Sequence, residues 1–218
     1  MIETNKINNM ETEELFIKNL FEKHYDLFEK HYNDMVSIKT YKTIWSSSYP
    51  DFYPYQSEMG QTTATKIYKK KPADLSDKIL NKFSEDEIYY SCRYGKESWG
   101  SVFYFYNKAN KVKLLFVENK NKMVLSQVDY LAIDNLFINK RLFYMRDSRE
   151  KETFYIDKYS YDEKNIIALI VRNGYYNGLS NILPERTFRF NFDDSAVKIF
   201  SKQQKLNGEI NESQIYPR

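Results

Sequence analysis

The most constraining feature of the sequence is an alternation of hydrophobic and polar residues that extends from Glu87 to about Ser201. A period of two is typical of strands with one buried and one exposed face. Polar stretches such as NKANK, DSREK and DEKN interrupt the alternation and are typical of short turns. Short strands joined by such turns predict an antiparallel meander rather than βαβ units. The predicted strands are Ile88–Arg93, Ser101–Tyr106, Val112–Glu118, Met123–Tyr130, Arg141–Arg146, Thr153–Tyr161, Ile166–Arg172, Thr187–Phe192 and Val197–Ser201.

Two segments before this region show helical patterns. Residues 12–35 carry apolar side chains at steps of three and four, and Thr12 can cap the first turn. We expect this helix to dock on the sheet through Leu20, Phe21 and Phe28. Residues 73–83 follow Pro72, a residue favoured at the start of a helix, and predict a second, short helix.

The expected fold is therefore α+β, with N-terminal helices packed on a multi-stranded antiparallel, meander-type sheet that is curved or partly closed. A chain of 218 residues fits one domain, spanning residues 1–218. Its expected parts are a helical segment at 1–83, the sheet at 84–204 and a loose polar tail at 205–218.

Charge is unevenly distributed along the chain. Residues 1–34 contain eight acidic residues and four lysines, a net charge of −4, whereas the remainder has 29 basic and 22 acidic residues, a net charge of +7. We interpret this asymmetry as an acidic helix that packs beside a basic body.

Residues 40–71 follow neither period, and they form a long connection rich in aromatic side chains. Long loops inside a domain are uncommon and often functional. Prolines 50 and 54 exclude an uninterrupted helix or central strand. These aromatic side chains either pin the loop to the sheet or point outward as anchors for a partner. The predicted partner-binding residues are Trp45, Tyr49, Phe52, Tyr53 and Tyr55.

The composition narrows the possible cofactors and locations. A single cysteine, Cys92, excludes an internal disulfide and a multi-cysteine zinc site. His24 and His31 lie seven residues apart, about 10.5 Å along a helix axis, too far to share one metal. We expect no metal and no cofactor. The N-terminus has no signal-peptide pattern and no stretch is long enough to cross a bilayer, so we expect a cytoplasmic protein without a membrane partner.

Acidic clusters are the one feature that favours an enzyme. Glu85–Glu87 and Asp193–Asp194 could supply paired carboxylates if the fold brought them together. Both clusters fall at predicted strand ends, where solvated acids are common. An enzyme with carboxylates assembled only in the fold stays an alternative, and the sequence shows no catalytic motif.

Nucleic-acid binding is the second alternative. Residues 99–104, WGSVFY, partly match the aromatic motif of RNA-recognition domains, but Glu97 and Ser98 replace its basic residue and glycine. Aromatic residues on an open sheet can stack on bases, and basic residues can contact phosphates. The βαββαβ order of those domains is not visible in the sequence.

The hairpin at Tyr159–Gly174 reads Tyr-x-Tyr-Asp-x-x-Asn-x-Ile, followed by Arg-Asn-Gly. This pattern resembles hairpins of small bacterial proteins encoded beside polymorphic toxins, many of which are immunity proteins. The resemblance covers about residues 100–175. It implies a non-enzymatic binding protein whose partner is another protein, a cognate toxin, which it neutralises by occlusion.

Overall fold

The structure is a computed structural model of the whole chain. It describes residues 2–26, 30, 37, 42–48, 55–59, 66–83, 89–94, 101–107, 112–119, 122–130, 137–147, 149, 151–177, 181–193, 196–205 and 207–217.

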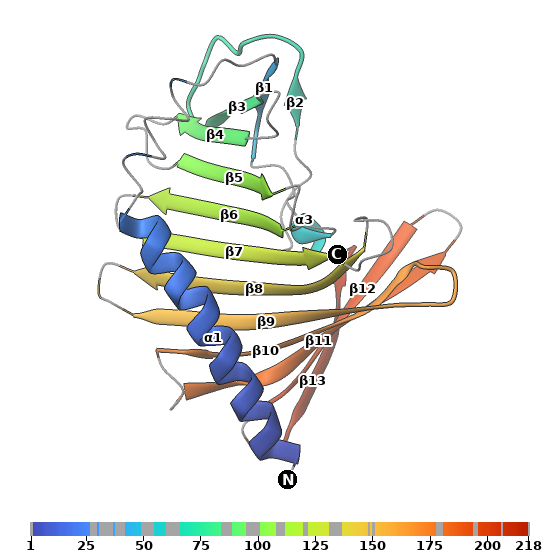
Figure 1. Cartoon of the computed structure of the whole chain (residues 1–218). Helices are drawn as coiled ribbons and strands as arrows, with labels where there is room; N and C mark the ends of the chain where they lie inside the picture. Colours follow the sequence, from blue (N-terminus) through green and yellow to red (C-terminus); the bar gives the residue numbers. More distant parts are fainter. Residues whose placement is uncertain are drawn as a thin grey trace.

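One long helix and one large antiparallel sheet dominate these residues (Figure 1). The strands pair in the order β13-β12-β11-β10-β9-β8-β7-β6-β5-β4-β3-β1-β2. From β3 to β13 every strand pairs with its neighbour in sequence, and β1 lies between β2 and β3. The sheet ends at β2 and β13, so it is open. The elements are α1 (Ile2–Asp26), β1 (Lys42–Ser46), α3 (Gln56–Met59), β2 (Ile67–Tyr68), β3 (Lys78–Phe83), β4 (Tyr89–Tyr94), β5 (Ser101–Asn107), β6 (Val112–Asn119), β7 (Lys122–Tyr130), β8 (Ile138–Asp147), β9 (Glu152–Tyr161), β10 (Ile167–Tyr176), β11 (Ile182–Asp193), β12 (Ala196–Gln204) and β13 (Ile210–Tyr216).

The predicted α+β fold, with a helix on an antiparallel meander, is confirmed. Strands β4 to β12 coincide with the nine predicted strands, most of them longer by a few residues. Alternation fixed their positions because a strand with one buried face keeps a period of two wherever it lies in the sheet.

Four predictions about the rest of the chain were wrong. The connection expected at 40–71 contains strand β1, the short helix α3 and strand β2. The expected helix at 73–83 is a turn followed by strand β3, which pairs with β1 and β4 on its two sides. The tail at 205–218 is not loose, because Ile210–Tyr216 forms β13 against β12. The first helix begins at Ile2 rather than at residue 12. Most residues between Asp26 and the expected end at residue 35 lie outside the described part of the chain.

Helix α1 crosses one face of the sheet over β7, β8 and β9 (Figure 1). Ile17 and Phe21 are fully buried, and the Phe21 ring meets the Tyr144 ring of β8 edge-on at 4.8 Å. Leu20 is half-buried, and Phe28 lies outside the described residues. Two acids of α1 pair with the sheet: Glu13 with Lys140 at 2.5 Å and Glu22 with Arg146 at 2.6 Å. The expected contact between an acidic helix and a basic body is confirmed.

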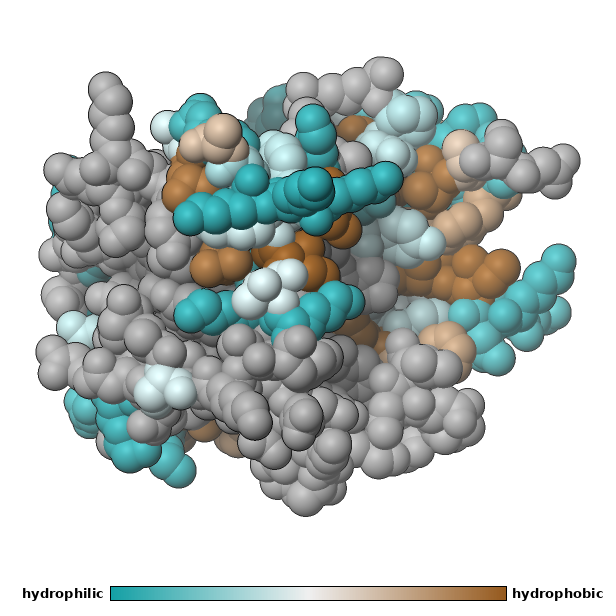
Figure 2. Space-filling model, turned by 90° about the horizontal axis from the view of Figure 1, so that it is seen from above, coloured by the Kyte–Doolittle hydropathy of each residue, from teal (hydrophilic) through white to brown (hydrophobic). Residues whose placement is uncertain are grey.

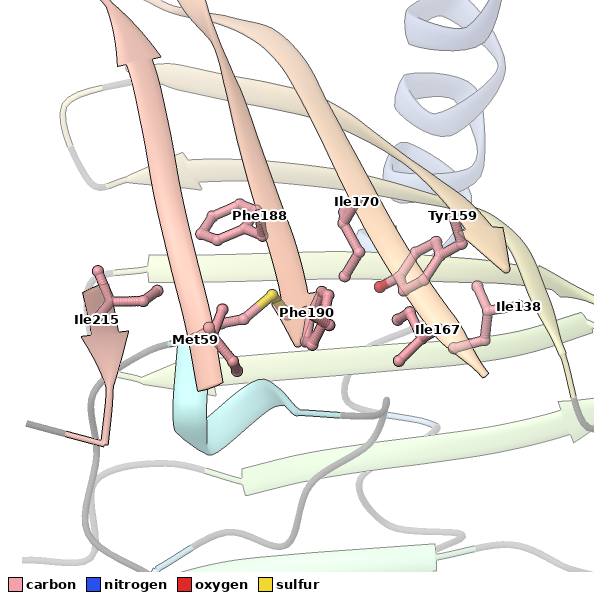
Figure 3. Packing of buried hydrophobic residues seen from close by; sticks show 9 residues of the cluster. Met59, Ile138, Tyr159, Ile167, Ile170, Phe188, Phe190 and Ile215 are labelled. Atoms are coloured by element: carbon pink, nitrogen blue, oxygen red, sulfur yellow. The ribbon is translucent and has the colours of Figure 1, made fainter. Parts of the chain in front are cut away.

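A second core lies on the opposite face of strands β8 to β13. Side chains alternate along a strand, so Tyr159 points away from the face that Phe154 shares with α1. Short helix α3 inserts Met59 beneath this face, next to Phe188 and Phe190 (Figure 3). The whole cluster consists of Met59, Ile138, Tyr159, Ile167, Ile170, Phe188, Phe190, Ile199 and Ile215.

Candidate recognition surface

The predicted residue Trp45 lies in β1, the middle strand of the group β2-β1-β3 at one end of the sheet. Its cross-strand partners are Tyr68 in β2 and Leu80 in β3. Residues opposite one another in a sheet point to the same face. Trp45, Tyr68 and Leu80 therefore form one continuous apolar and aromatic row, and all three are half-buried.

The reverse face is buried where β1 meets β3. Ser46, Ile79 and Asn81 are each at most 3% exposed. The Asn81 side-chain amide donates to the Ile44 carbonyl at 3.0 Å and to the Ser46 hydroxyl at 2.8 Å, and so ties β3 to β1. A buried amide with both partners satisfied specifies the register of the pair. The row that contains Trp45 is consequently held in place from behind.

Lysines flank the exposed side of this row. The ammonium groups of Lys66 and Lys78 lie 5.3 Å and 5.9 Å from the centre of the Tyr68 ring. Both distances are within the range of a cation–π interaction. Lys82, the partner of Thr43 in register, continues the same side of β3. We name the surface formed by Trp45, Tyr68, Leu80, Lys66, Lys78 and Lys82 the Trp45 face.

The Trp45 face lies in the most basic part of the chain. Residues 66–82 contain six lysines and two aspartates, a net charge of +4, which exceeds the +3 of the whole chain. The Asp74 carboxylate accepts the backbone N–H of Ser76 at 2.9 Å, and the Lys78 ammonium donates to the Ser76 carbonyl of the same turn at 3.0 Å. The Ser76 backbone and side chain, followed by the charge of Lys78, lower the pKa of Asp74, so its carboxylate stays ionised. Seen from above, hydrophilic and hydrophobic residues lie side by side on the surface (Figure 2).

The other predicted partner-binding residues are placed differently. Tyr55 has a positive φ of 59° and is half-buried. Its ring centre lies 5.1 Å from Phe190 and 6.0 Å from Phe192, so it packs on β11 beside the second core. Burial, followed by the charge of Glu58, raises the pKa of its hydroxyl. Tyr49, Phe52 and Tyr53 lie outside the described residues. Trp45 and Tyr55 contact different strands and do not form one cluster.

Sequence reasoning missed Tyr68, Lys66 and Lys78. The local signal was the string KIYKKK at 66–71, in which an aromatic residue lies among four lysines. The pairing of β1 with β2 and β3 brings these residues to Trp45, and the sequence does not show that register.

The acidic residues and histidines considered for chemistry lie only partly within the described residues. Asp193 of the predicted acidic cluster is exposed and pairs with Lys198 at 2.9 Å. The carboxylates of residues 85–87, the side chain of His24, and His31 lie outside the described part of the chain. Within the described ranges, no group of three or more histidine, cysteine or acidic residues is arranged to hold a metal.

Comparison of the chain with models of known families, with characterised proteins and with solved structures finds no match. None of the helices in the described ranges is long and apolar enough to cross a membrane.

Proposed function

We propose that this chain is a non-enzymatic, cytoplasmic binding protein that recognises another protein. We further propose that it is an immunity protein, which neutralises a bacterial toxin by occluding it. The observation that carries the proposal is the Trp45 face, where half-buried aromatic side chains lie among lysines on a rigidly backed part of the sheet.

The composition of this face is that of a protein interface. Tyrosine and tryptophan offer large contact areas with few rotatable bonds, and they are enriched among the residues that dominate binding energy. Interfaces commonly place such side chains in the centre and charged groups at the rim. The rim of the Trp45 face is basic, so the complementary partner surface is acidic. Because Asn81 and Ile79 hold the strands from behind, binding requires little reordering.

The direct test is to purify the tagged chain from its native host and identify bound proteins by mass spectrometry. The affinity of the recovered partner is then measured for wild type, Tyr68→Ala and the double variant Lys66→Gln/Lys78→Gln. Loss of a central aromatic anchor costs about 2 kcal/mol or more, a drop in affinity of roughly thirtyfold.

The matched control is Lys158→Gln/Lys164→Gln, which removes the same charge from two exposed lysines on β9 and the turn after it. It should leave the affinity within about twofold, because isolated surface charges contribute little. If the Trp45-face variants bind the partner as well as this control does, the interface lies elsewhere. Recovery of no protein partner would count against the function itself.

The same face also favours a second candidate, nucleic-acid binding, because lysines beside an aromatic ring can contact phosphates and bases. The Tyr68 ring already lies beneath two ammonium groups, which leaves less of it for stacking on a base. Titration with single-stranded RNA at several salt concentrations separates the two candidates. Nucleic-acid binding predicts a steep fall in affinity with salt, by about 0.7 log unit per log unit of salt for each phosphate contact.

A further inference from the structure

A row of charged side chains crosses four neighbouring strands on the face that carries the second core. Arg141 of β8 lies opposite Asp157 of β9, Asp157 lies opposite Arg172 of β10, and Arg172 lies opposite Arg186 of β11. The row is one step along the strands from Phe188, whose position is visible in Figure 3. Three arginines and one aspartate give the row a net charge of +2.

Asp157 pairs with two of the three arginines of this row. Its side chain is 0% exposed, and it accepts from the Nε and a terminal nitrogen of Arg141 at 3.0 Å and 2.6 Å. It also accepts from the Nε and a terminal nitrogen of Arg172 at 2.7 Å and 3.0 Å. Burial alone would raise the pKa of Asp157, but the two guanidinium groups lower it overall, so the carboxylate stays ionised. Oδ2 accepts three of these hydrogen bonds and Oδ1 accepts one, and Arg186 donates none of them.

Arg186 has a different environment. Its Nε donates to the Ser201 hydroxyl at 2.7 Å, and its guanidinium lies 4.8 Å from the centre of the Phe188 ring. Among the residues that the structure describes, no carboxylate pairs with it. The Arg172 guanidinium is 5.2 Å from the same ring. Two like charges thus lie directly opposite each other on adjacent strands, an arrangement that destabilises a sheet. Burial and the charge of Arg172 both lower the pKa of Arg186.

We propose that Arg172 and Arg186 form a binding site for one oxyanion group, a phosphate or a carboxylate, carried by a ligand. Planar guanidinium groups bind such anions through paired N–H donors, as Arg141 and Arg172 bind Asp157 in the same row. A bound anion would neutralise the repulsion between the two arginines. The Arg172 side chain is 23% exposed and Arg186 is half-buried, so the site is open to solvent on one side.

This site is separate from the Trp45 face, and it does not rest on the proposed protein partner. The ring faces of Phe188 and Tyr155 beside it are covered by guanidinium groups, and Phe188 is 1% exposed. A base therefore has no open ring to stack on, so the site recognises a single anionic group rather than a nucleic-acid strand.

The experiment measures the thermal unfolding midpoint and calorimetric binding of the full chain with inorganic phosphate, with malonate, and with sodium chloride at equal ionic strength. We expect phosphate or malonate to raise the midpoint above the chloride value, since a ligand that binds only the folded state stabilises it. In Arg186→Gln the anion affinity should fall by about tenfold or more, as expected for lost hydrogen bonds to a charged group. The anion that binds identifies the group, phosphate or carboxylate.

The matched control is Arg189→Gln, on the same strand. Arg189 is 57% exposed, lies over Phe200 and is 3.5 Å from Glu212. This variant should bind the anion as wild type does. Arg186→Lys keeps the charge and loses the planar fork, so it should bind more weakly than wild type, and it serves as the readout if Arg186→Gln does not fold. The proposal is overturned if no anion stabilises wild type beyond chloride. It is equally overturned if the Arg189 and Arg186 variants lose binding to the same extent.

Discussion

The contact of α1 with the sheet and the Trp45 face use the same kinds of residues in opposite ways. Under α1, Lys140 and Arg146 of β8 each meet a glutamate of the helix. On the Trp45 face, Lys66 and Lys78 meet the Tyr68 ring, and no carboxylate within the described residues forms an ion pair with either. Charges that pair inside the chain hold the fold together. Among the described residues, the Lys66 and Lys78 ammonium groups are not paired with an acid in this way, so they are available to a partner, and Lys78 also donates to the Ser76 carbonyl at 3.0 Å.

The aromatic side chains of the two regions also differ in their exposure to solvent. Phe21 and Tyr144 at the α1 contact are 0% exposed, whereas Trp45 and Tyr68 keep part of their surface in solvent. The comparison therefore predicts that substitutions under α1 change stability and that substitutions on the Trp45 face change binding. The following predictions test that division, beginning with the largest effect on stability.

Removal of the Phe21 ring should have the largest effect. Phe21→Ala leaves a cavity against Tyr144 and removes the ring over which the Arg146 guanidinium lies at 4.8 Å. Truncation of a buried phenylalanine costs about 3–5 kcal/mol. Urea denaturation should show this loss as a lower midpoint. Phe16→Ala, on the same helix but 49% exposed, is the control and should change the free energy of unfolding by less than about 0.5 kcal/mol. Equal effects of the two variants would mean that α1 does not dock through Phe21.

Glu152 is the next most sensitive position. Its carboxylate accepts from Lys18 of α1 at 2.9 Å and from the Tyr144 hydroxyl at 2.5 Å. Glu152→Gln should destabilise the protein by about 1.5–3 kcal/mol, the range for a lost hydrogen bond to a charged group. Glu163→Gln, in the exposed turn after β9, is the control and should be neutral within error. A neutral Glu152→Gln would show that the ion pair between Lys18 and Glu152 contributes nothing to stability.

The same carboxylates predict the response to acid. Burial would raise the pKa of Glu152, but hydrogen bonds from Lys18 and Tyr144 lower it overall, and the arginines do the same for Asp157. Groups whose pKa is lowered by folding stabilise the protein above their unfolded pKa of about 4, and this contribution is lost as the pH falls through the folded pKa. The free energy of unfolding should therefore fall below roughly pH 4–5. The fall should be shallower in Glu152→Gln, and an identical slope in both proteins would contradict the assignment.

Sequence patterns predicted what depends on local periodicity. The strands β4 to β12 alternate over enough residues to fix both their type and their position. In the segment 73–83, Leu75, Ile79 and Phe83 recur at the spacing of a helix. Strand β3 takes only six of these residues, which are too few to distinguish a period of two from a helical period. Pairing with β1 and β4 favours a strand, and that pairing cannot be predicted from the sequence of the segment alone. β13 is similar, since only Ile215 is buried and the strand exists because β12 pairs with it.

The candidate site follows the same division. Trp45 was proposed because aromatic side chains are crowded around prolines 50 and 54, but its neighbours Tyr68 and Leu80 come from other strands. The positions of Arg172 and Arg186 can be recognised from the alternation of the sequence. Arg172 comes two residues after buried Ile170 on β10, and Arg186 two residues before buried Phe188 on β11, so both occupy inward-facing positions in an alternating pattern. Charged residues at such positions need a partner, and the identity of that partner depends on the strand register.

The smallest effect on stability is expected where the effect on binding is largest. In Lys66→Gln/Lys78→Gln the Tyr68 ring loses two cation–π contacts, each worth about 0.5–1 kcal/mol at an exposed site. The same change relieves repulsion within a segment whose net charge is +4. The two contributions oppose each other, so the free energy of unfolding should change by less than about 0.5 kcal/mol. Urea denaturation of the variant, wild type and the Lys158→Gln/Lys164→Gln control measures this change in the free energy of unfolding. A loss above about 1 kcal/mol would show that these lysines hold β2 and β3 in place, and the Trp45 face would then be part of the scaffold rather than a surface for a partner.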